Sequence, residues 1–226
     1  MAHKGGVALI IGVGDGLSAS LARLLAKEGY TLALASRRVE KLDRLAKETK
    51  AKIHRCDASD PAQVAALFKG VGDHEVMIYN PSYRIRGPFI ELDPTEVKKS
   101  LEITAFGAFL AGQQAARNML PRGRGTIMFT GASAGVKGYA QSAPFAMGKF
   151  ALRGLAQSMA RELHPRGIHV AHIVVDGGIR SSQRPDGGND NMLNPDSIAR
   201  SYLHLLHQPR DSWSWEIEVR PWVETF

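Results

Sequence analysis

The sequence lacks the features that mark several large classes of protein. Its single cysteine, Cys56, can form no disulfide within the chain and excludes a cysteine-based metal cluster. No apolar run approaches the roughly 18 residues that a membrane-spanning helix requires. The N-terminus leads directly into a short apolar run and has no small-residue cleavage site of a secretory signal peptide. We therefore expect a cytoplasmic protein with no membrane partner.

Charge of one sign is not concentrated anywhere along the chain either. The formal net charge is +7, yet no block of five or six like charges occurs. Because a basic total without a basic stripe or a stacking platform is weak evidence for nucleic-acid binding, we expect no nucleic-acid partner. A positive balance still attracts anions, and a phosphorylated small molecule is the simplest one. No pair of histidines has metal-ligand spacing with a carboxylate, so we also expect no metal.

What the chain does contain is an alternation of short β-rich runs with segments of helical periodicity. This alternation predicts βαβ units around a parallel sheet, and runs that are almost wholly apolar predict helices on both faces. The 226 residues show no linker or repeat, so we expect one α/β domain, residues 1–226, with a Rossmann-type doubly wound sheet. The predicted strands are Val7 to Ile11, Thr31 to Ala35, Lys52 to Cys56, Glu75 to Tyr79, Thr126 to Thr130, His169 to Val175 and Trp215 to Val219.

Helix starts and one long loop can also be predicted. Three helices are expected to begin where a capping side chain precedes a proline, at Asp60-Pro61, Asp93-Pro94 and Asn194-Pro195. The second of these helices is expected to run to about Leu120. The segment Arg180 to Asn194 is polar and has no periodicity, which predicts a loop. Because it has little apolar surface to bury, we expect residues 181–194 to be mobile without substrate.

A glycine-rich turn follows the first predicted strand and precedes the first predicted helix. Gly12, Gly14 and Gly16, followed by Leu17, would let the backbone approach a pyrophosphate, while the helix N-terminus supplies free N–H groups. Between a first strand and a first helix, this pattern predicts a dinucleotide site. The alternative is a tight turn that serves only its own geometry.

Residues after the next three predicted strands bear on the identity of the dinucleotide. Ser36 and Arg37 follow the second strand, where a carboxylate would repel a 2′-phosphate; serine does not repel it, and arginine pairs with it. This favours NADP(H), with NAD(H) as the alternative, and Asp15 in the turn argues against the preference. Asp57 and Asn80 follow the third and fourth strands, at the edge where open α/β sheets bind their ligands.

With these motifs in this order, the chain resembles the short-chain dehydrogenase/reductase family over almost its whole length. Gly12-x-x-x-Gly16-x-Ser18 resembles the family's phosphate turn, Asp57 its acid near the adenine, and Asn80-Pro81-Ser82 its turn after the fourth strand. Lys149 resembles its catalytic lysine. The segment Asp176 to Ser181 resembles the one that flanks the nicotinamide, with Gly177, Ile179 and Ser181 as contacts. The resemblance implies a nicotinamide cofactor, a small-molecule substrate, and a homodimer or homotetramer.

The catalytic positions depart from the family's pattern. The family's Tyr-x-x-x-Lys motif is matched by Phe145 and Lys149, so the lysine is present and the tyrosine is not. The family's serine falls on Ala132, with Ser133 one residue later, and its asparagine falls on Thr104. In the family the tyrosine hydroxyl transfers a proton, which Phe145 cannot do. Losing a positioned general acid typically costs about 10²–10⁴ in rate.

Other side chains are candidates for the missing acid, and the function has two interpretations. Tyr83 and Tyr139 lie near the expected substrate position, although aromatic packing is the alternative role for both. His172 is on the opposite face of its strand from His169 and is a candidate to face the cofactor or to sit in the core. We expect an NADP(H)-dependent oxidoreductase with a rearranged site. The alternative is a non-catalytic NADP(H)-binding protein, a redox sensor or structural subunit.

The C-terminal stretch predicts how the last strand is covered. Trp213, Trp215, Ile217 and Val219 alternate with polar residues, which predicts one wide apolar face on an edge strand. Such a face is usually covered, so it favours a homo-oligomer. Packing of the tryptophans within the core of one chain is the alternative.

Overall fold

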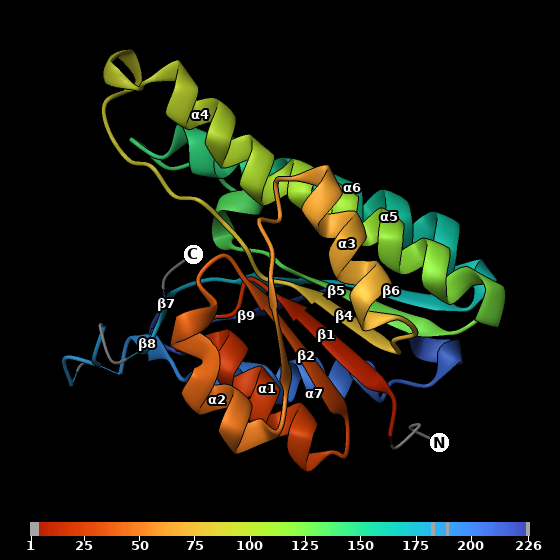
Figure 1. Ribbon diagram of the computed structural model, residues 1–226. Coiled ribbons are helices and arrows are strands. Elements are labelled where there is room, and N and C mark those ends of the chain that lie inside the picture. The colour runs from red at the N-terminus through yellow and green to blue at the C-terminus, as the bar shows by residue number, and fades with distance from the viewer. Residues whose placement is uncertain (1–4, 182–183, 189, 225–226) are drawn as a thin grey trace.

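A computed structural model of the chain describes residues 5–181, 184–188 and 190–224, and its main feature is a seven-stranded parallel sheet (Figure 1). The strand order is β3-β2-β1-β4-β5-β6-β9, and every neighbouring pair is parallel. The strands are β1 (Val7–Ile11), β2 (Thr31–Ser36), β3 (Lys52–Arg55), β4 (Val76–Tyr79), β5 (Gly125–Thr130), β6 (Ile168–Val175) and β9 (Glu216–Val219). All seven predicted strands are therefore confirmed, with ends that differ by at most one residue.

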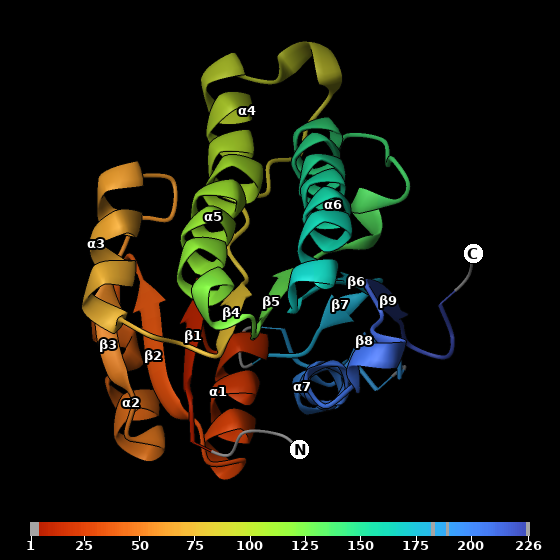
Figure 2. The same cartoon turned by 90° about the vertical axis from the view of Figure 1, so that its right-hand side faces the viewer.

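Helices cover both faces of this sheet, which confirms the doubly wound α/β fold (Figures 1 and 2). One layer holds α1 (Leu17–Lys27), α2 (Asp43–Thr49) and α7 (Pro195–Leu206), and the other holds α3 (Pro61–Val71), α4 (Pro94–Leu101), α5 (Gly107–Met119) and α6 (Ala143–Leu163). Strand β1 shows why its run is continuously apolar. Ile10 packs in the hydrophobic core under the first layer, and Leu9 packs in the hydrophobic core under the second. Consecutive residues of this strand are therefore buried on opposite faces of the sheet.

The predicted helix caps are present as side-chain hydrogen bonds. Asp60 accepts from the backbone N–H of Ala62 and Gln63 at the start of α3. Asp93 accepts from Thr95 N–H at the start of α4, and Asn194 accepts from the second residue of α7. Each cap satisfies a donor that the first helical turn leaves open, and the proline that follows needs no donor partner.

The helix predicted from Asp93 to about Leu120 is interrupted by one wide turn. A π-helical segment, Glu102–Phe106, joins α4 to α5, and a 3-10 turn at Leu120–Arg122 follows α5. Tyr79, fully buried at the end of β4, donates a hydrogen bond from its hydroxyl to the carbonyl of Ile103 in the wide turn, at 2.5 Å. Gly107 follows this turn, where a Cβ would lie 2.4 Å from the same hydroxyl. The π turn thus fits the chain around Tyr79.

The prediction of a loop from Arg180 to Asn194 is wrong near the C-terminal end of this segment. Strand β8 (Met192–Leu193) pairs in parallel with β7 (Gly178–Ile179), so this part of the segment is regular. Residues 182, 183 and 189 lie outside the described residues, and the mobility of the segment stays a prediction.

The predicted single apolar face on the last strand is also wrong. Because β9 begins at Glu216, Trp215 lies before the strand and packs on the core cluster under α5 and α6. Ile217 and Val219 pack on the other cluster, under α1 and α7. Trp213 stacks on the ring of His169 with 4.8 Å between ring centroids. The two tryptophans thus have packing partners within the chain.

Candidate cofactor and reaction site

Three adjoining pockets lie along the edge of the sheet where the strands end, beside the point at which β1 and β4 are neighbours. The basic pocket, about 520 Å³, is lined by the glycine turn, α1 and α2; the middle pocket, about 270 Å³, lies at the ends of β2, β3 and β4; the inner pocket, about 800 Å³, lies beyond β5 and β6. Ser36 and Arg38 line both the basic and the middle pocket, and Asn80 and Ser82 line both the middle and the inner pocket. The pockets therefore form one groove, at the place where doubly wound sheets bind dinucleotides.

The glycine turn is held in shape by close approaches to the neighbouring strand end. Gly12 has φ +81°, and a Cβ there would lie 2.7 Å from Pro81. Ser18 donates to the carbonyl of Gly12 at 3.3 Å, and the side-chain amide of Asn80 donates to Ser18 at 2.6 Å. Ser18, which stands where the family has its third glycine, therefore ties the turn to the end of β4.

The same turn leaves an open cradle at the start of α1. Nothing lies within 4 Å of where a Cβ would stand on Gly14 or Gly16. Gly16 is the N-cap of α1 and no side chain caps this helix, while Leu17 is buried and anchors the first turn. Uncapped N–H groups and the positive end of the helix dipole favour an anion. The residues present therefore fit a dinucleotide pyrophosphate.

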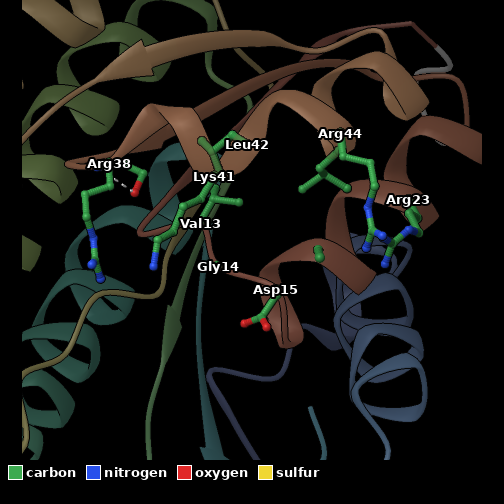
Figure 3. Close-up of a pocket in the computed structure, with 11 residues that line it drawn as sticks. Val13, Gly14, Asp15, Arg23, Arg38, Lys41, Leu42 and Arg44 are labelled. Carbon is green, nitrogen blue, oxygen red and sulfur yellow. Dashed lines mark hydrogen bonds between the residues drawn. The ribbon is translucent and has the colours of Figure 1, made fainter. Parts of the chain in front are cut away.

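Cations from one side of the segment after β2 face the basic pocket. Arg38, Lys41, Arg44 and Arg23 line this pocket, and Figure 3 shows their side chains. Arg23 is already paired with Glu48 at 2.8 Å. Sequence reasoning singled out Arg37 and missed these four. The signal was the spacing of three residues between Arg38, Lys41 and Arg44, which puts them on one side of a helical segment.

The middle pocket contains the other predicted residues of the cofactor's adenosine end. Arg37 lines it, and its backbone carbonyl accepts a hydrogen bond from Arg55 at 3.0 Å. Asp57 also lines it and accepts from both the N–H and the hydroxyl of Ser59, at 3.0 and 2.6 Å. These contacts fix the loop after β3 so that the Asp57 carboxylate stays at the edge of the pocket.

Lys149 is the most perturbed ionisable group of the inner pocket. Its side chain is almost fully buried, and its ammonium donates to the carbonyl of Thr130 at 2.7 Å. Burial lowers the pKa of Lys149 to about 8. The Phe145 ring lies beside it, with 5.8 Å between Nζ and the ring centroid. The helix α6 therefore presents a lysine of lowered pKa and an aromatic ring, and no hydroxyl, at the family's proton-transfer positions.

Several other predicted residues face the same inner pocket. Ser133, on the turn after β5, and Tyr139, on the loop before α6, both line it. The Tyr139 ring is partly exposed and lies 5.6 Å from Nζ of Lys137. Gly177 and Ile179 line the pocket from the segment after β6. Ser133 and Tyr139 are thus the hydroxyl groups, among the predicted catalytic candidates, that line this cavity.

Three predicted residues do not line the inner pocket. Tyr83 donates its hydroxyl to Glu96 at 2.5 Å. Thr104 is fully buried in the π turn and accepts from the N–H of Tyr83 at 3.3 Å, so it serves the packing of the loop. Ser181 is paired through its backbone with Arg184. The acid proposed at Tyr83 and the helper proposed at Thr104 therefore do not line the cavity that Lys149 lines.

His172 is a buried core residue with one charged partner. Its Nδ1 lies 2.9 Å from Glu216, which also receives two hydrogen bonds of 2.7 Å from Arg153. Burial lowers the pKa of His172 to about 4, which the carboxylate opposes only in part. Its Nε2 has no hydrogen-bond partner among the described residues and fills the space beside Gly131. His172 does not line the inner pocket, although it lies directly behind it.

The sequence profile described as short chain dehydrogenase matches residues 6–185. The chain belongs to the short-chain dehydrogenase family. A solved short-chain dehydrogenase from Rhodopseudomonas palustris is 34% identical, covers 97% of this chain and 100% of its own, and superposes with a TM-score of 0.86. This match extends over β9 and α7, beyond the residues that the profile covers, so the resemblance seen in the sequence is confirmed.

Further members of the short-chain dehydrogenase family resemble the chain more distantly. An uncharacterized oxidoreductase of Staphylococcus aureus is 26% identical over 225 residues, 95% of this chain and 96% of that protein. A very-long-chain 3-oxoacyl-CoA reductase of Neurospora crassa is 33% identical over 186 residues, and the match covers only 55% of that protein. A metagenomic short-chain oxidoreductase solved in complex with NADP is 27% identical, with a TM-score of 0.84 over 96% of this chain and 97% of its own. These relatives are thus named a dehydrogenase, a reductase or an oxidoreductase, and the one cofactor named with them is NADP.

Within the ranges that the structure describes, no helix has both the length and the apolarity to cross a bilayer. Within the same ranges, no group of three or more His, Cys, Asp or Glu side chains is arranged to hold a metal ion.

Proposed function

We propose that this short-chain dehydrogenase is an NADP(H)-dependent oxidoreductase with a rearranged proton-transfer site. The observation that carries the proposal is the basic pocket, which Arg38 and Lys41 line together with the glycine turn and Ser36. Two cations and a hydroxyl at the end of β2 suit a 2′-phosphate, which a carboxylate there would repel. The NADP complex of the metagenomic relative supports the same cofactor.

The groove assigns a part of the cofactor to each pocket. The cradle at Gly14 and Gly16 would hold the pyrophosphate, Asp57 would lie beside the adenine, and Asn80 and Lys149 would approach the nicotinamide riboside. When bound, the cofactor supplies a hydride, which the protein itself cannot provide. The chain's own contribution is therefore to position the substrate beside the nicotinamide and to supply or accept a proton.

Proton transfer in this site would depend on groups other than a tyrosine. Lys149, with its pKa lowered to about 8 by burial, can give up a proton near neutral pH, and it keeps donors free after its bond to Thr130. Ser133 and Tyr139 offer hydroxyls that line the same cavity. We propose reduction of a carbonyl with this displaced acid, or of an activated double bond whose carbanion takes its proton from water.

A specific observation favours the second candidate, a non-catalytic NADP(H)-binding protein. Phe145 stands where the family's acid would be, and Thr104 is fully buried and bonded to the backbone of Tyr83. Both changes remove proton-transfer groups and leave the cradle and the basic pocket intact. Such a protein would bind the cofactor tightly and turn nothing over.

The decay of NADPH absorbance over a panel of ketones, aldehydes and conjugated enals separates the two candidates. We expect slow but substrate-dependent decay with one class of acceptor, and very low rates with simple ketones. Unchanged absorbance with every acceptor, together with tight NADPH binding, would favour the non-catalytic protein. A rate near the ordinary enzyme median of about 10 s⁻¹ on simple ketones would show that a full-strength acid is present.

We also propose that the chain forms a homodimer or homotetramer through α5 and α6. Phe106 and Phe109, stacked on each other, are 45% and 41% exposed, and Met147 and Phe150 on α6 are 48% and 45% exposed. Large apolar side chains exposed together on neighbouring elements are typical of an interface. Light scattering after gel filtration tests this, and a mass equal to that of one chain would contradict it.

A further inference from the structure

The inner pocket gathers arginines that the chemistry described so far does not use. Arg84 and Arg86 line it from the loop after β4, and Arg184 lines it from the segment after β7. About a hundred residues of sequence separate the two segments, so this convergence is a property of the fold. Lys149 adds a fourth cation to the same lining.

The acids of this pocket do not neutralise these arginines. Two acids line it, Asp176 and Glu224. The carboxylate of Asp176 is buried and already lies 3.6 Å from Lys137 and 3.5 Å from Arg220. Among the described residues, Arg84, Arg86 and Arg184 make no ion pair with either acid. The pocket therefore has an excess of positive charge that faces its open volume.

Arg84 lies beside the residue at the family's tyrosine position and experiences this excess directly. Its guanidinium carbon is 5.0 Å from the centroid of the Phe145 ring, the ring that occupies the family's tyrosine position. Burial and the neighbouring charges of Arg86 and Arg184 lower the pKa of Arg84. Like charges held together are costly unless an anion binds between them. A bound oxyanion would relieve this repulsion a short distance from the hydride-transfer position.

We propose that the substrate of this oxidoreductase carries an oxyanion, a carboxylate or a phosphate, which binds to Arg84, Arg86 and Arg184 in the inner pocket. The planar guanidinium fork matches both groups through paired N–H···O bonds. Because Arg84 contacts the Phe145 ring, the anion is expected only a few bonds from the carbon that receives the hydride. The inference rests on the proposed function, since it assigns the substrate class of the same site.

Calorimetric titration of the NADP⁺-saturated protein tests the anion site without requiring turnover. Saturating NADP⁺ fills the basic pocket, so that added anions report on the inner pocket alone. The probes are malonate for a carboxylate, inorganic phosphate for a phosphate, and malonamide as the uncharged match of malonate. We expect at least one anion to bind and malonamide not to bind. Binding should weaken as salt is added.

Charge-neutral variants assign the binding to the arginines. Arg84→Gln and, separately, Arg86→Gln should each lower the affinity for the anion by about tenfold or more, the usual effect of losing a hydrogen bond to a charged group. Both side chains are on an exposed loop, so folding should persist. Arg161→Gln, on the exposed face of α6, is the matched control and should change nothing.

The outcomes separate this inference from the proposed function. Equal binding of malonate and malonamide, or anion binding that both variants leave unchanged, would overturn the oxyanion site even if NADP⁺ binds well. Failure of NADP⁺ to bind in the same calorimeter would overturn the proposed function. Anion binding to the cofactor-free protein that Arg84→Gln abolishes would still support the site. Once an active acceptor is known, its acid should be reduced faster than its neutral amide, and Arg84→Gln should remove that difference.

Discussion

The basic pocket and the inner pocket are two ends of one groove, and they are built in different ways. At the basic end the backbone supplies the site: Gly12 has a positive φ, and the cradle at Gly14 is open. At the inner end side chains supply it, with buried Lys149 bonded to Thr130 and packed beside Phe145. From this difference we expect cofactor binding to survive the loss of the family's tyrosine, because the residues proposed to hold the dinucleotide do not include Phe145.

The largest expected effect comes from a substitution that strains the backbone of the glycine turn at the basic end. Gly12→Ala places a Cβ about where Pro81 stands, in a region of φ that costs about 1–2 kcal/mol for other residues. With overpacking, the free energy of unfolding should fall by about 2–5 kcal/mol. Urea denaturation measures this. Gly14→Ala is the control: its Cβ meets open space, so stability should persist while NADPH affinity falls. Equal stability of wild type and Gly12→Ala would contradict the account.

The inner end should respond in the opposite direction when its buried charge is removed. The folded pKa of Lys149, about 8, is below its ordinary value of 10.5, so the fold disfavours the ammonium. This penalty is fully present below pH 8 and is lost as the pH rises toward 10.5. Lys149→Met should therefore stabilise the cofactor-free protein at pH 7, by on the order of 3 kcal/mol at most, and less at pH 10. Urea denaturation at both pH values tests this, and destabilisation at pH 7 would contradict it.

A smaller effect is expected at the cations of the basic pocket. Arg38→Ala should lower the affinity for NADPH by about tenfold, the usual effect of losing a hydrogen bond to a charged group. It should leave the affinity for NADH within about twofold of the wild-type value. Fluorescence titration of both cofactors measures the ratio. Lys47→Ala removes an exposed cation from α2 that lines none of the three pockets, and it should leave the ratio unchanged. An equal loss of both cofactors in Arg38→Ala would place the residue outside the 2′-phosphate site.

The smallest expected effect on binding comes from restoring the family's tyrosine. A tyrosine fits the volume of Phe145, so Phe145→Tyr should leave NADPH affinity and folding nearly unchanged. The new hydroxyl would lie beside Lys149 and should raise the rate of carbonyl reduction if Ser133 helps to position the substrate. Steady-state NADPH oxidation measures the gain. Strongly weakened NADPH binding in this variant would show that the two ends are coupled.

Local sequence patterns were sufficient for the scaffold and for the cofactor end. The apolar strands and the capped helix starts depend on neighbours in the chain, so all seven strands and the caps at Asp60 and Asp93 could be predicted. The glycine turn could be found because its spacing is local. Where contacts join distant segments the predictions failed: the pairing of β8 with β7 and the packing of Trp215 depend on tertiary contacts.

At the inner pocket, even more depends on contacts between distant segments, which the sequence does not reveal. Tyr83 is near the reaction centre in sequence, but the π turn and Glu96 hold it away from the pocket. The convergence of Arg84 with Arg184 has no local signal at all. The buried environment of Lys149 depends on the sheet beneath it, so the direction of its pKa shift could not be inferred from the residue alone.

The central claim is that the basic end is a working NADP(H) site in a chain that lacks the family's tyrosine. Equilibrium fluorescence titration of the wild-type protein with NADPH and with NADH tests it most directly. The account predicts that NADPH binds at least about tenfold tighter than NADH, because Arg38 and Lys41 face the 2′-phosphate position, and a tenfold ratio is about 1.4 kcal/mol. Equal affinities, or tighter binding of NADH, would contradict it.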